Sequence, residues 1–225
     1  MNAQKGFEAV LWDMDGVIVD TYEGHFLSWK QSLDEVGQEY DEETFRTTFG
    51  MNNRLILNKI FGRTLEEDFM QKISDRKEEI FRRDIKGRVQ TLPGVMDWLR
   101  RFEKMGLKQA VASSAPQANI DALLDELSIR GFFQAEVAGA TLKGKPDPAV
   151  FLLAAKLLGV DPARCLVIED AIAGVEAAKR AGCRCLAVLT TNPAEALTRA
   201  DLIIQDLTSF NKEMLEDLAP SVLAQ

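Results

Sequence analysis

Four acidic side chains follow two of the apolar segments of this chain. Asp13 and Asp15 come directly after the run Phe7–Trp12, and Glu169-Asp170 follows a second apolar run. If these acids meet, their charges repel one another, and Mg²⁺, a hard cation that prefers oxygen ligands, is the natural way to neutralise them. The four acids therefore predict a Mg²⁺ site.

Hydroxyl and ammonium groups follow two further apolar segments. Ser113 and Ser114 come at the end of one, and a loop after another carries Lys143 and Lys145. A phosphoryl group needs both point cations and hydrogen-bond donors for its negative charge. Beside a metal ion, these groups indicate phosphoryl transfer.

The spacing of Asp13 and Asp15 would allow the two carboxylates to take different roles in one reaction. Side chains two residues apart on an extended strand end face the same way, so one carboxylate can attack phosphorus while the other handles the proton on the substrate oxygen. Gly16 lets the backbone turn sharply beneath them. Acidic pairs are also common in solvated turns, and the agreement with three other strand ends is what favours catalysis.

Alternating strand and helix patterns predict how these groups are positioned. Short connections between the elements are typical of a doubly wound α/β fold, in which a parallel sheet is covered on both faces. Ligands bind such sheets outside the carboxyl ends of the strands, where the groups above lie. We expect strands at 7–12, 107–113, 134–138, 165–168, 183–189 and 202–204, and helices at 95–105, 117–127, 148–158, 174–181, 194–199 and 209–218.

The segment after the first strand has a different pattern. Apolar residues recur at helical spacing, as in Phe26, Trp29 and Leu33, and no strand signal appears. We therefore predict a catalytic core formed by residues 1–20 and 92–225, with a helical cap domain inserted at residues 21–91.

Composition excludes several classes of partner. The 225 residues include 27 basic and 35 acidic side chains, and the formal charge of −8 repels a nucleic-acid backbone. No apolar run approaches the roughly 20 residues that span a bilayer. The three cysteines are expected to be reduced core residues, and a single histidine, His25, makes a His-based zinc site improbable. We expect a cytoplasmic protein with no nucleic-acid or membrane partner.

The motifs as a set resemble the haloacid dehalogenase superfamily. Asp13-Met14-Asp15-Gly16-Val17, Ser113, Lys145-Pro146 and Glu169-Asp170 match its motifs one to four in order, spacing and strand-end placement. The second aspartate of the first motif marks phosphotransferases, so dehalogenation is disfavoured. The insertion resembles the small helical cap of the subfamily that contains β-phosphoglucomutase, phosphoglycolate phosphatase and sugar-phosphate phosphatases.

The resemblance implies a role for each matching residue. Asp13 would be the nucleophile that forms an aspartyl-phosphate, and Asp15 the general acid and base. Phosphate-binding residues would be Ser113, Ser114 and Lys145, and the Mg²⁺ ligands would be Asp13, Asp15 through its backbone carbonyl, Glu169 and Asp170.

In the cap, the match implies that Thr21 lies at the hinge and that His25 assists Asp15, with Lys77 near His25. Arg54 would grip a distal phosphate. The residue pattern alone leaves plainer readings open: His25 could be a structural hydrogen-bonding group, Lys77 could extend to the surface at the edge of an apolar helix face, and Arg54 could be a solvated side chain.

Together these inferences predict a Mg²⁺-dependent phosphatase that acts on a small phosphorylated metabolite, with a sugar phosphate as the expected substrate, as a monomer or weak dimer. A β-phosphoglucomutase-like phosphohexomutase that uses the same phospho-aspartate is the alternative. A non-catalytic phosphometabolite-binding protein is the third reading, and the intact acids and Lys145 weigh against it.

Overall fold

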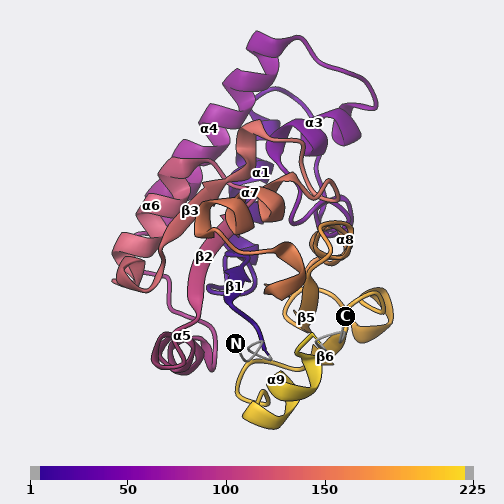
Figure 1. The fold of residues 1–225 in the computed structure, drawn as a ribbon. Helices are drawn as coiled ribbons and strands as arrows, with labels where there is room; N and C mark the ends of the chain where they lie inside the picture. The colour runs from indigo at the N-terminus through magenta and orange to yellow at the C-terminus, as the bar shows by residue number, and fades with distance from the viewer. Residues whose placement is uncertain (1–5, 221–225) are drawn as a thin grey trace.

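Across residues 6–220, which the computed structural model describes, six parallel strands form one sheet with helices on both faces (Figure 1). The strand order is β3-β2-β1-β4-β5-β6. The first and last five residues of the predicted core lie outside the described residues. The strands are β1 (Ala9–Trp12), β2 (Lys108–Ser113), β3 (Ala135–Ala138), β4 (Cys165–Glu169), β5 (Arg184–Val188) and β6 (Leu202–Ile204).

Alternate residues of each strand serve opposite faces of the sheet. Val10 and Trp12 of β1 join the apolar layer under α5 (Val95–Lys104), α6 (Gln117–Glu126) and α9 (Lys212–Leu218). The other layer lies under α7 (Ala149–Leu158) and α8 (Ile172–Arg180). On that side the strands present small residues, which lets these helices pack closely: Ala9, Ala110, Ala112, Cys165, Cys185 and Ala187. The two strand cysteines and Cys183 are buried and free, as predicted.

Four helices lie between β1 and α5 in the chain and stand above the sheet (Figure 1). They are α1 (Tyr22–Asp34), α2 (Glu42–Arg46), α3 (Asn53–Phe61) and α4 (Glu67–Ile85). Their apolar faces make a separate core around Trp29, Phe45 and Ile73. Below, this helical group (residues 22–85) is called the cap.

The two chain connections between the cap and the sheet domain run side by side. Val19, just before the cap, forms an antiparallel bridge with Thr91, just after it. The N–H of Leu92 also donates to the carbonyl of Ile18 at 2.9 Å. The cap is thus attached through one narrow, two-stranded neck.

The predicted α/β architecture is confirmed, and most element boundaries differ by one or two residues from the sequence-based ones; three helices show the differences best. Helix α8 begins at Ile172 rather than at Gly174, directly after a turn in which the Glu169 carboxylate accepts the N–H groups of Asp170 and Ala171. The segment expected to be a helix at 194–199 forms only a 3₁₀ turn at Ala194–Ala196. Helix α9 begins at Lys212, where the Asn211 side chain caps the N–H of Met214.

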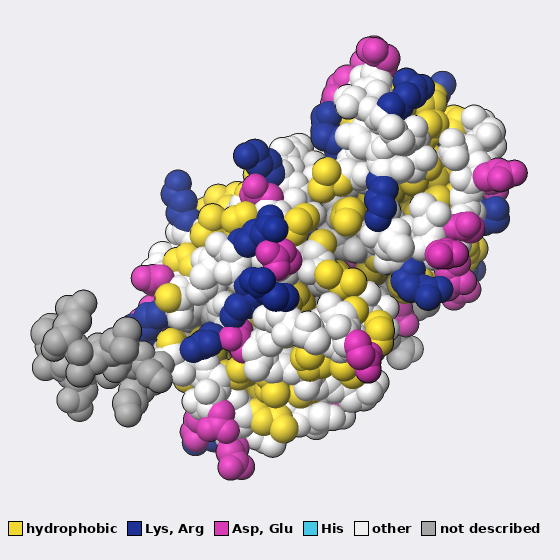
Figure 2. Space-filling view, turned by 90° about the vertical axis from the view of Figure 1, so that its right-hand side faces the viewer, with side chains coloured by type: hydrophobic (Ala, Val, Ile, Leu, Met, Phe, Trp, Pro, Cys, Tyr) yellow, Lys and Arg dark blue, Asp and Glu magenta, His cyan; other side chains and the backbone are white. Residues whose placement is uncertain are grey.

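The surface shows mixed charges. On the face drawn in Figure 2, lysine and arginine side chains alternate with acidic ones rather than forming a continuous basic patch. None of the helices in residues 6–220 has both the length and the apolar content needed to cross a bilayer.

Gly94, at the start of α5, offers a test of how this helix is anchored to the sheet domain. It has a φ of +81°, and a Cβ placed there would lie 2.5 Å from the backbone carbon of Leu207. Gly106 has a similar φ of +74° with open space around it. We expect Gly106→Ala to lower the free energy of unfolding by about 1 kcal/mol through backbone strain alone. Gly94→Ala should cost clearly more in urea denaturation, and equal losses would contradict the close approach.

Candidate active site

A buried lysine joins the ends of two neighbouring strands. The Lys145 Nζ lies 2.5 Å from Asp13 Oδ1, after β1, and 2.6 Å from Glu169 Oε1, at the end of β4. Only 1% of Lys145 is exposed. Because β1 and β4 pair in parallel, with Trp12 opposite Ile168, their carboxyl ends deliver both acids to the same point.

The acids at this point carry more negative charge than the lysine neutralises. One oxygen from each of Asp13, Glu169 and Asp170 can be chosen so that all three lie within 4.8 Å of one another. Three carboxylates and one ammonium leave two negative charges, and Asp170 Oδ1 is buried without a hydrogen-bond partner. A cluster of oxygen ligands with one unused lone-pair donor fits a divalent cation such as Mg²⁺.

The pKa values of the clustered groups reflect the same excess of negative charge. Burial, together with the charges of Glu169 and Asp15, raises the pKa of Asp13 against the opposing effect of Lys145. Burial and the neighbouring acids likewise raise the pKa of Asp170. Although burial alone would lower it, the charges of Asp13 and Glu169 hold the pKa of Lys145 above its usual range. A bound cation would remove the repulsion that favours protonated carboxyl groups.

Two residues that the sequence analysis missed hold Asp170 in place. The Thr191 hydroxyl donates to Asp170 Oδ2 at 2.6 Å, and the Asn192 amide donates to the Asp170 carbonyl at 3.0 Å. Both residues follow β5, so the strand-end rule that identified the other site residues would have found them too. Their bonds leave Oδ1 of Asp170 as the oxygen available to a metal.

Two glycines make the close packing of these acids possible. An ideal Cβ on Gly16 would lie 2.0 Å from Asp170 Oδ2, and one on Gly174 would lie 1.7 Å from Glu169 Oε1. Gly16 also has a φ of +84°, which side-chain-bearing residues rarely adopt. Gly174, in the first turn of α8, leaves room for the Glu169 carboxylate over the helix start.

A chain of hydrogen bonds connects Asp15 to the cap. Asp15 Oδ1 accepts from the Thr21 hydroxyl at 2.6 Å and lies 3.0 Å from His25 Nε2. Lys77 Nζ lies 2.8 Å from the other ring nitrogen, Nδ1, of His25. Since an ammonium can only donate, Nδ1 accepts from Lys77 and Nε2 carries the proton that is given to Asp15. Phe81 stacks on the imidazole at 3.9 Å between ring centroids and fixes its plane.

This chain sets the charge of Asp15. Burial would raise its pKa, but the electrostatic interaction and hydrogen bond with the His25 ring, together with the hydrogen bond from the Thr21 hydroxyl, lower it to about 2. Asp15 is therefore ionised and directed toward the cap, and its carboxylate is not part of the acidic cluster. Of the groups on Asp15, its backbone carbonyl remains the predicted metal ligand.

Glu78 binds Lys77 at the cap end of this hydrogen-bond chain. Its Oε1 accepts from Lys77 at 2.9 Å and from Asn53 at 2.8 Å, while its Oε2 accepts from Asn119 of α6 at 2.5 Å. Arg82 donates to Asn119 Oδ1 at 2.8 Å. Burial would raise the pKa of Glu78, but the Lys77 charge and the other donors lower it, so the carboxylate is charged.

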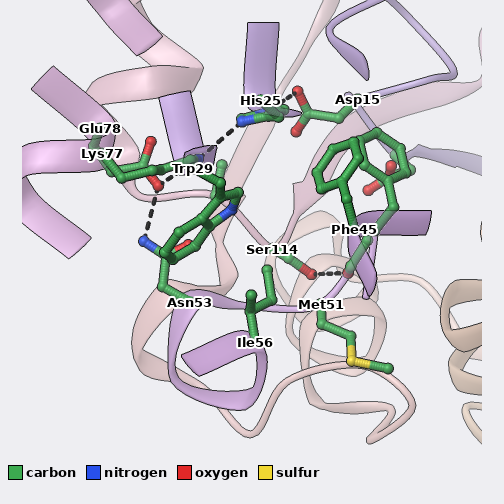
Figure 3. A pocket seen from close by; sticks show the side chains of 14 residues that line it. Asp15, His25, Trp29, Phe45, Met51, Asn53, Ile56, Lys77, Glu78 and Ser114 are labelled. Atoms are coloured by element: carbon green, nitrogen blue, oxygen red, sulfur yellow. Dashed lines mark hydrogen bonds and ion pairs between the residues drawn. The ribbon is translucent and has the colours of Figure 1, made fainter. Parts of the chain in front are cut away.

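A small cavity of about 40 Å³ lies between the cap and the sheet edge. Figure 3 shows the Asp15–His25 pair and the hydrogen bond between Asn53 and Glu78 among the side chains that line it. The lining residues are Asp13, Asp15, His25, Trp29, Phe45, Phe49, Gly50, Met51, Asn53, Ile56, Lys77, Glu78, Ser114 and Ala115.

Further polar contacts hold the cap against the sheet domain beside the cavity, in addition to those of His25 with Asp15 and of Arg82 with Asn119. Ser114 donates to the Gly50 carbonyl at 2.7 Å, and Asn52 donates to the Leu142 carbonyl at 3.1 Å. Asn119 also donates to Glu78. The Gly50 backbone also approaches Ala171 so closely that a Cβ would lie 2.7 Å from the Ala171 Cβ.

Of the remaining predicted site residues, Ser114 lines the cavity, whereas Ser113 and Arg54 do not. Ser113 is fully buried, and its hydroxyl accepts the N–H of Ala115 rather than lining the cavity, whereas Ser114 does line it. Arg54 is exposed and paired with Glu67 at 2.6 Å, outside the cavity. Its neighbour Asn53 faces the cavity instead, because successive residues of a helix point about 100° apart.

Comparisons with known proteins give consistent matches over most of the chain. A family model described as a haloacid dehalogenase-like hydrolase matches residues 7–182. A phosphorylated carbohydrates phosphatase from Thermotoga maritima is 31% identical, over 92% of this chain and all of that protein. A β-phosphoglucomutase from Bacillus subtilis is 34% identical, over 93% of this chain and 94% of that protein. A crystal structure of β-phosphoglucomutase from Clostridium difficile superposes with a TM-score of 0.84 at 27% identity, covering 94% and 96% of the two chains.

The position of Gly174 predicts how sensitive the acidic cluster is to a single methyl group. In Gly174→Ala the methyl must displace Glu169, which breaks its bond to Lys145 and its bonds to two backbone N–H groups. Breaking a buried ion pair costs about 3–5 kcal/mol. We expect a loss of that size in denaturation and a smaller rise of Tm on adding Mg²⁺. Gly131→Ala, at an open position, is the control, and equal behaviour of the two variants would refute this packing.

Proposed function

Because the chain belongs to the haloacid dehalogenase-like hydrolase family and is an enzyme of that type, we propose that it is a Mg²⁺-dependent phosphatase acting on a small phosphorylated sugar. The family resemblance predicted from the motifs is confirmed by the family match. The observation that carries the proposal is the placement of Asp13 against Lys145, with Asp15 two residues away and hydrogen-bonded to the cap.

Asp13 is the proposed nucleophile. One of its carboxylate oxygens forms a bond to phosphorus while the bond between phosphorus and the substrate alcohol oxygen breaks, which gives an aspartyl-phosphate. Lys145 and the hydroxyl of Ser114 would stabilise the phosphoryl oxygens. Water then attacks the phosphorus, releases inorganic phosphate and restores the Asp13 carboxylate.

Asp15 is the proposed proton carrier in both steps. It would protonate the departing alcohol oxygen in the first step and take a proton from the attacking water in the second. The ionised Asp15 of the free enzyme must gain a proton before the first step. The chain from Lys77 through His25 ends on its carboxylate and offers a route for that proton.

The acidic cluster is the proposed Mg²⁺ site. Asp13, Glu169 and Asp170 would hold the ion with the backbone carbonyl of Asp15, and Thr191 would fix the rotamer of Asp170. When bound, the ion neutralises the phosphoryl and carboxylate charges that would otherwise repel each other.

Substrate entry would require the cap to move. A cavity of about 40 Å³ is far below the roughly 300–1,000 Å³ of pockets that hold small-molecule ligands, and is too small for a phosphorylated sugar. The hydrogen bonds from Ser114 to Gly50 and from Asn52 to Leu142 would open to admit it. Closure over the substrate would then exclude bulk water from the leaving-group proton transfer.

The phosphohexomutase alternative has support from the similarity to β-phosphoglucomutases. That reaction must hold a bisphosphate intermediate, and the predicted ligand for its second phosphate was Arg54. Since Arg54 is paired with Glu67 outside the cavity, the geometry favours hydrolysis.

A direct experiment separates the proposed reactions. The protein is incubated with Mg²⁺ and a panel of sugar phosphates, and free phosphate and sugar-phosphate isomers are measured together, with and without trace bisphosphate. We expect phosphate release that EDTA abolishes and that Asp13→Asn reduces to background. Isomer formation with little free phosphate would instead establish the mutase, and unchanged turnover in Asp13→Asn would contradict the aspartyl-phosphate.

The role of His25 predicts a dependence on the leaving group. His25→Asn breaks the route from Lys77, so hydrolysis of a sugar phosphate, whose alcohol needs a proton, should slow about 10²-fold. Hydrolysis of p-nitrophenyl phosphate, whose leaving group departs without a proton, should change much less. Lys30→Ala, on the exposed side of α1, serves as the control. Equal slowing of both substrates would mean that His25 only supports the fold.

A further inference from the structure

The cap side of the cavity carries almost no net charge. Among the cavity-lining residues contributed by α1–α4 and their connections, Lys77 and Glu78 are the charged pair, and they lie 2.9 Å apart. His25 donates to Asp15, so its ring is already engaged by the catalytic acid. In the described part of the chain, the cap contributes no arginine to this lining.

Lys77 already makes two hydrogen bonds within the protein. It is 2% exposed, donates to His25 and to Glu78, and its ammonium lies over the Trp29 and Phe81 rings at 5.4 and 5.2 Å. An anion that recruited Lys77 would have to compete with Glu78 and would break the hydrogen bond to His25. The lysine is therefore poorly placed to bind a second anionic group.

Glu78 places a negative charge on the cap side of the cavity. Its carboxylate lines the cavity, is 5% exposed, and is held by Lys77, Asn53 and Asn119 in a fixed position. A substrate carboxylate or second phosphate placed beside this paired carboxylate would lose its hydration and find no unpaired cation in the cap-side lining, so its charge would be buried without compensation. A hydroxyl group can instead donate to the carboxylate or accept from the Asn53 amide.

The rest of the cap side is apolar. Trp29, Phe45, Phe49, Met51 and Ile56 line it, and aromatic and aliphatic surfaces of this kind pack against the C–H faces of a polyol or sugar ring. The combination of apolar wall and one fixed hydroxyl-binding pair suits an uncharged alcohol.

We propose that Glu78 is a specificity-determining residue that restricts the enzyme to phosphate monoesters of uncharged alcohols and excludes substrates with a second anionic group. The proposal rests on the proposed phosphatase function and goes beyond it, because it specifies the charge of the leaving group. Asn53, in the first turn of α3, is its partner in recognising a hydroxyl.

The wild-type protein provides the first test. With Mg²⁺ present, kcat/KM for phosphate release is compared within two pairs that differ in one anionic group. These are glucose 6-phosphate against 6-phosphogluconate, and glycerol 3-phosphate against 3-phosphoglycerate. We expect at least a tenfold preference for the uncharged alcohol in each pair that is turned over. Equal turnover, or preference for the acid, would overturn the proposal while leaving the phosphatase function intact, whereas no phosphate release from any sugar phosphate would refute the function itself.

Two variants test the residues. Asn53→Arg adds a cation beside Glu78 and should shift the ratio toward the anionic member of each pair by at least tenfold. Glu78→Gln removes the like charge and should shift the ratio in the same direction. Glu79→Gln, the next residue on the exposed face of α4, removes one charge outside the cavity and should leave the ratio unchanged. If neither cavity variant moves the ratio while both fold, Glu78 does not set the selectivity. If a variant does not fold, the wild-type ratios still decide the charge preference.

Discussion

The ammonium of Lys145, buried between Asp13 and Glu169, is the contact on which the catalytic edge depends. A buried ion without a partner costs several kcal/mol, so these three groups can be removed from water only together. The sheet meets this requirement by pairing β1 directly with β4 and by bringing the loop before α7 over both strand ends. Because two negative charges remain after Lys145 is counted, the same arrangement that stabilises the fold favours a divalent cation.

A second constraint joins the sheet domain to the cap. Asp15 belongs to the loop after β1, yet its carboxylate is held by Thr21 and His25, which enter with the first cap helix. The ionisation of Asp15, and with it the proposed proton transfer, therefore depends on the position of the cap. Contacts such as that between Ser114 and Gly50 link this position to the strand end that carries the proposed phosphate-binding residues. Opening and closing of the cap would then gate both substrate entry and the state of the acid.

Much of the fold could be predicted because its signals are local. Apolar runs that end in Asp13, Ser113 and Glu169 marked three strands and their functional ends at once, and the comparisons confirm the family that these motifs indicated. The helix boundaries at 174 and 209 were less accurate, because local hydrogen bonds of Glu169 before α8 and of the Asn211 cap of α9 accompany the actual helix starts. Such side-chain bonds cannot be read from helix periodicity.

The cap residues of the site were harder to predict. Both Asn53 and Arg54 lie in the first turn of α3, and the sequence offers no way to tell which one faces the cavity. Glu78 likewise reads as one acid in a charged helix, although it is buried against Lys77, Asn53 and Asn119. These assignments depend on how the cap helices pack on one another and on α6.

The sequence by itself thus determined the alternation of strands and helices, the place of the helical insertion and the acids at the strand ends, because each is encoded in neighbouring residues. Only the tertiary structure decided which cap side chains share the cavity with Asp13 and which charges remain unpaired there. In the folded chain Arg54 is exposed and paired with Glu67, and Glu78 is buried. Asp170 Oδ1 is buried without a hydrogen-bond partner. The physical reason is that charge, burial and hydrogen bonding at this site are properties of groups brought together from distant parts of the chain, and the packing of the cap on the sheet sets their distances.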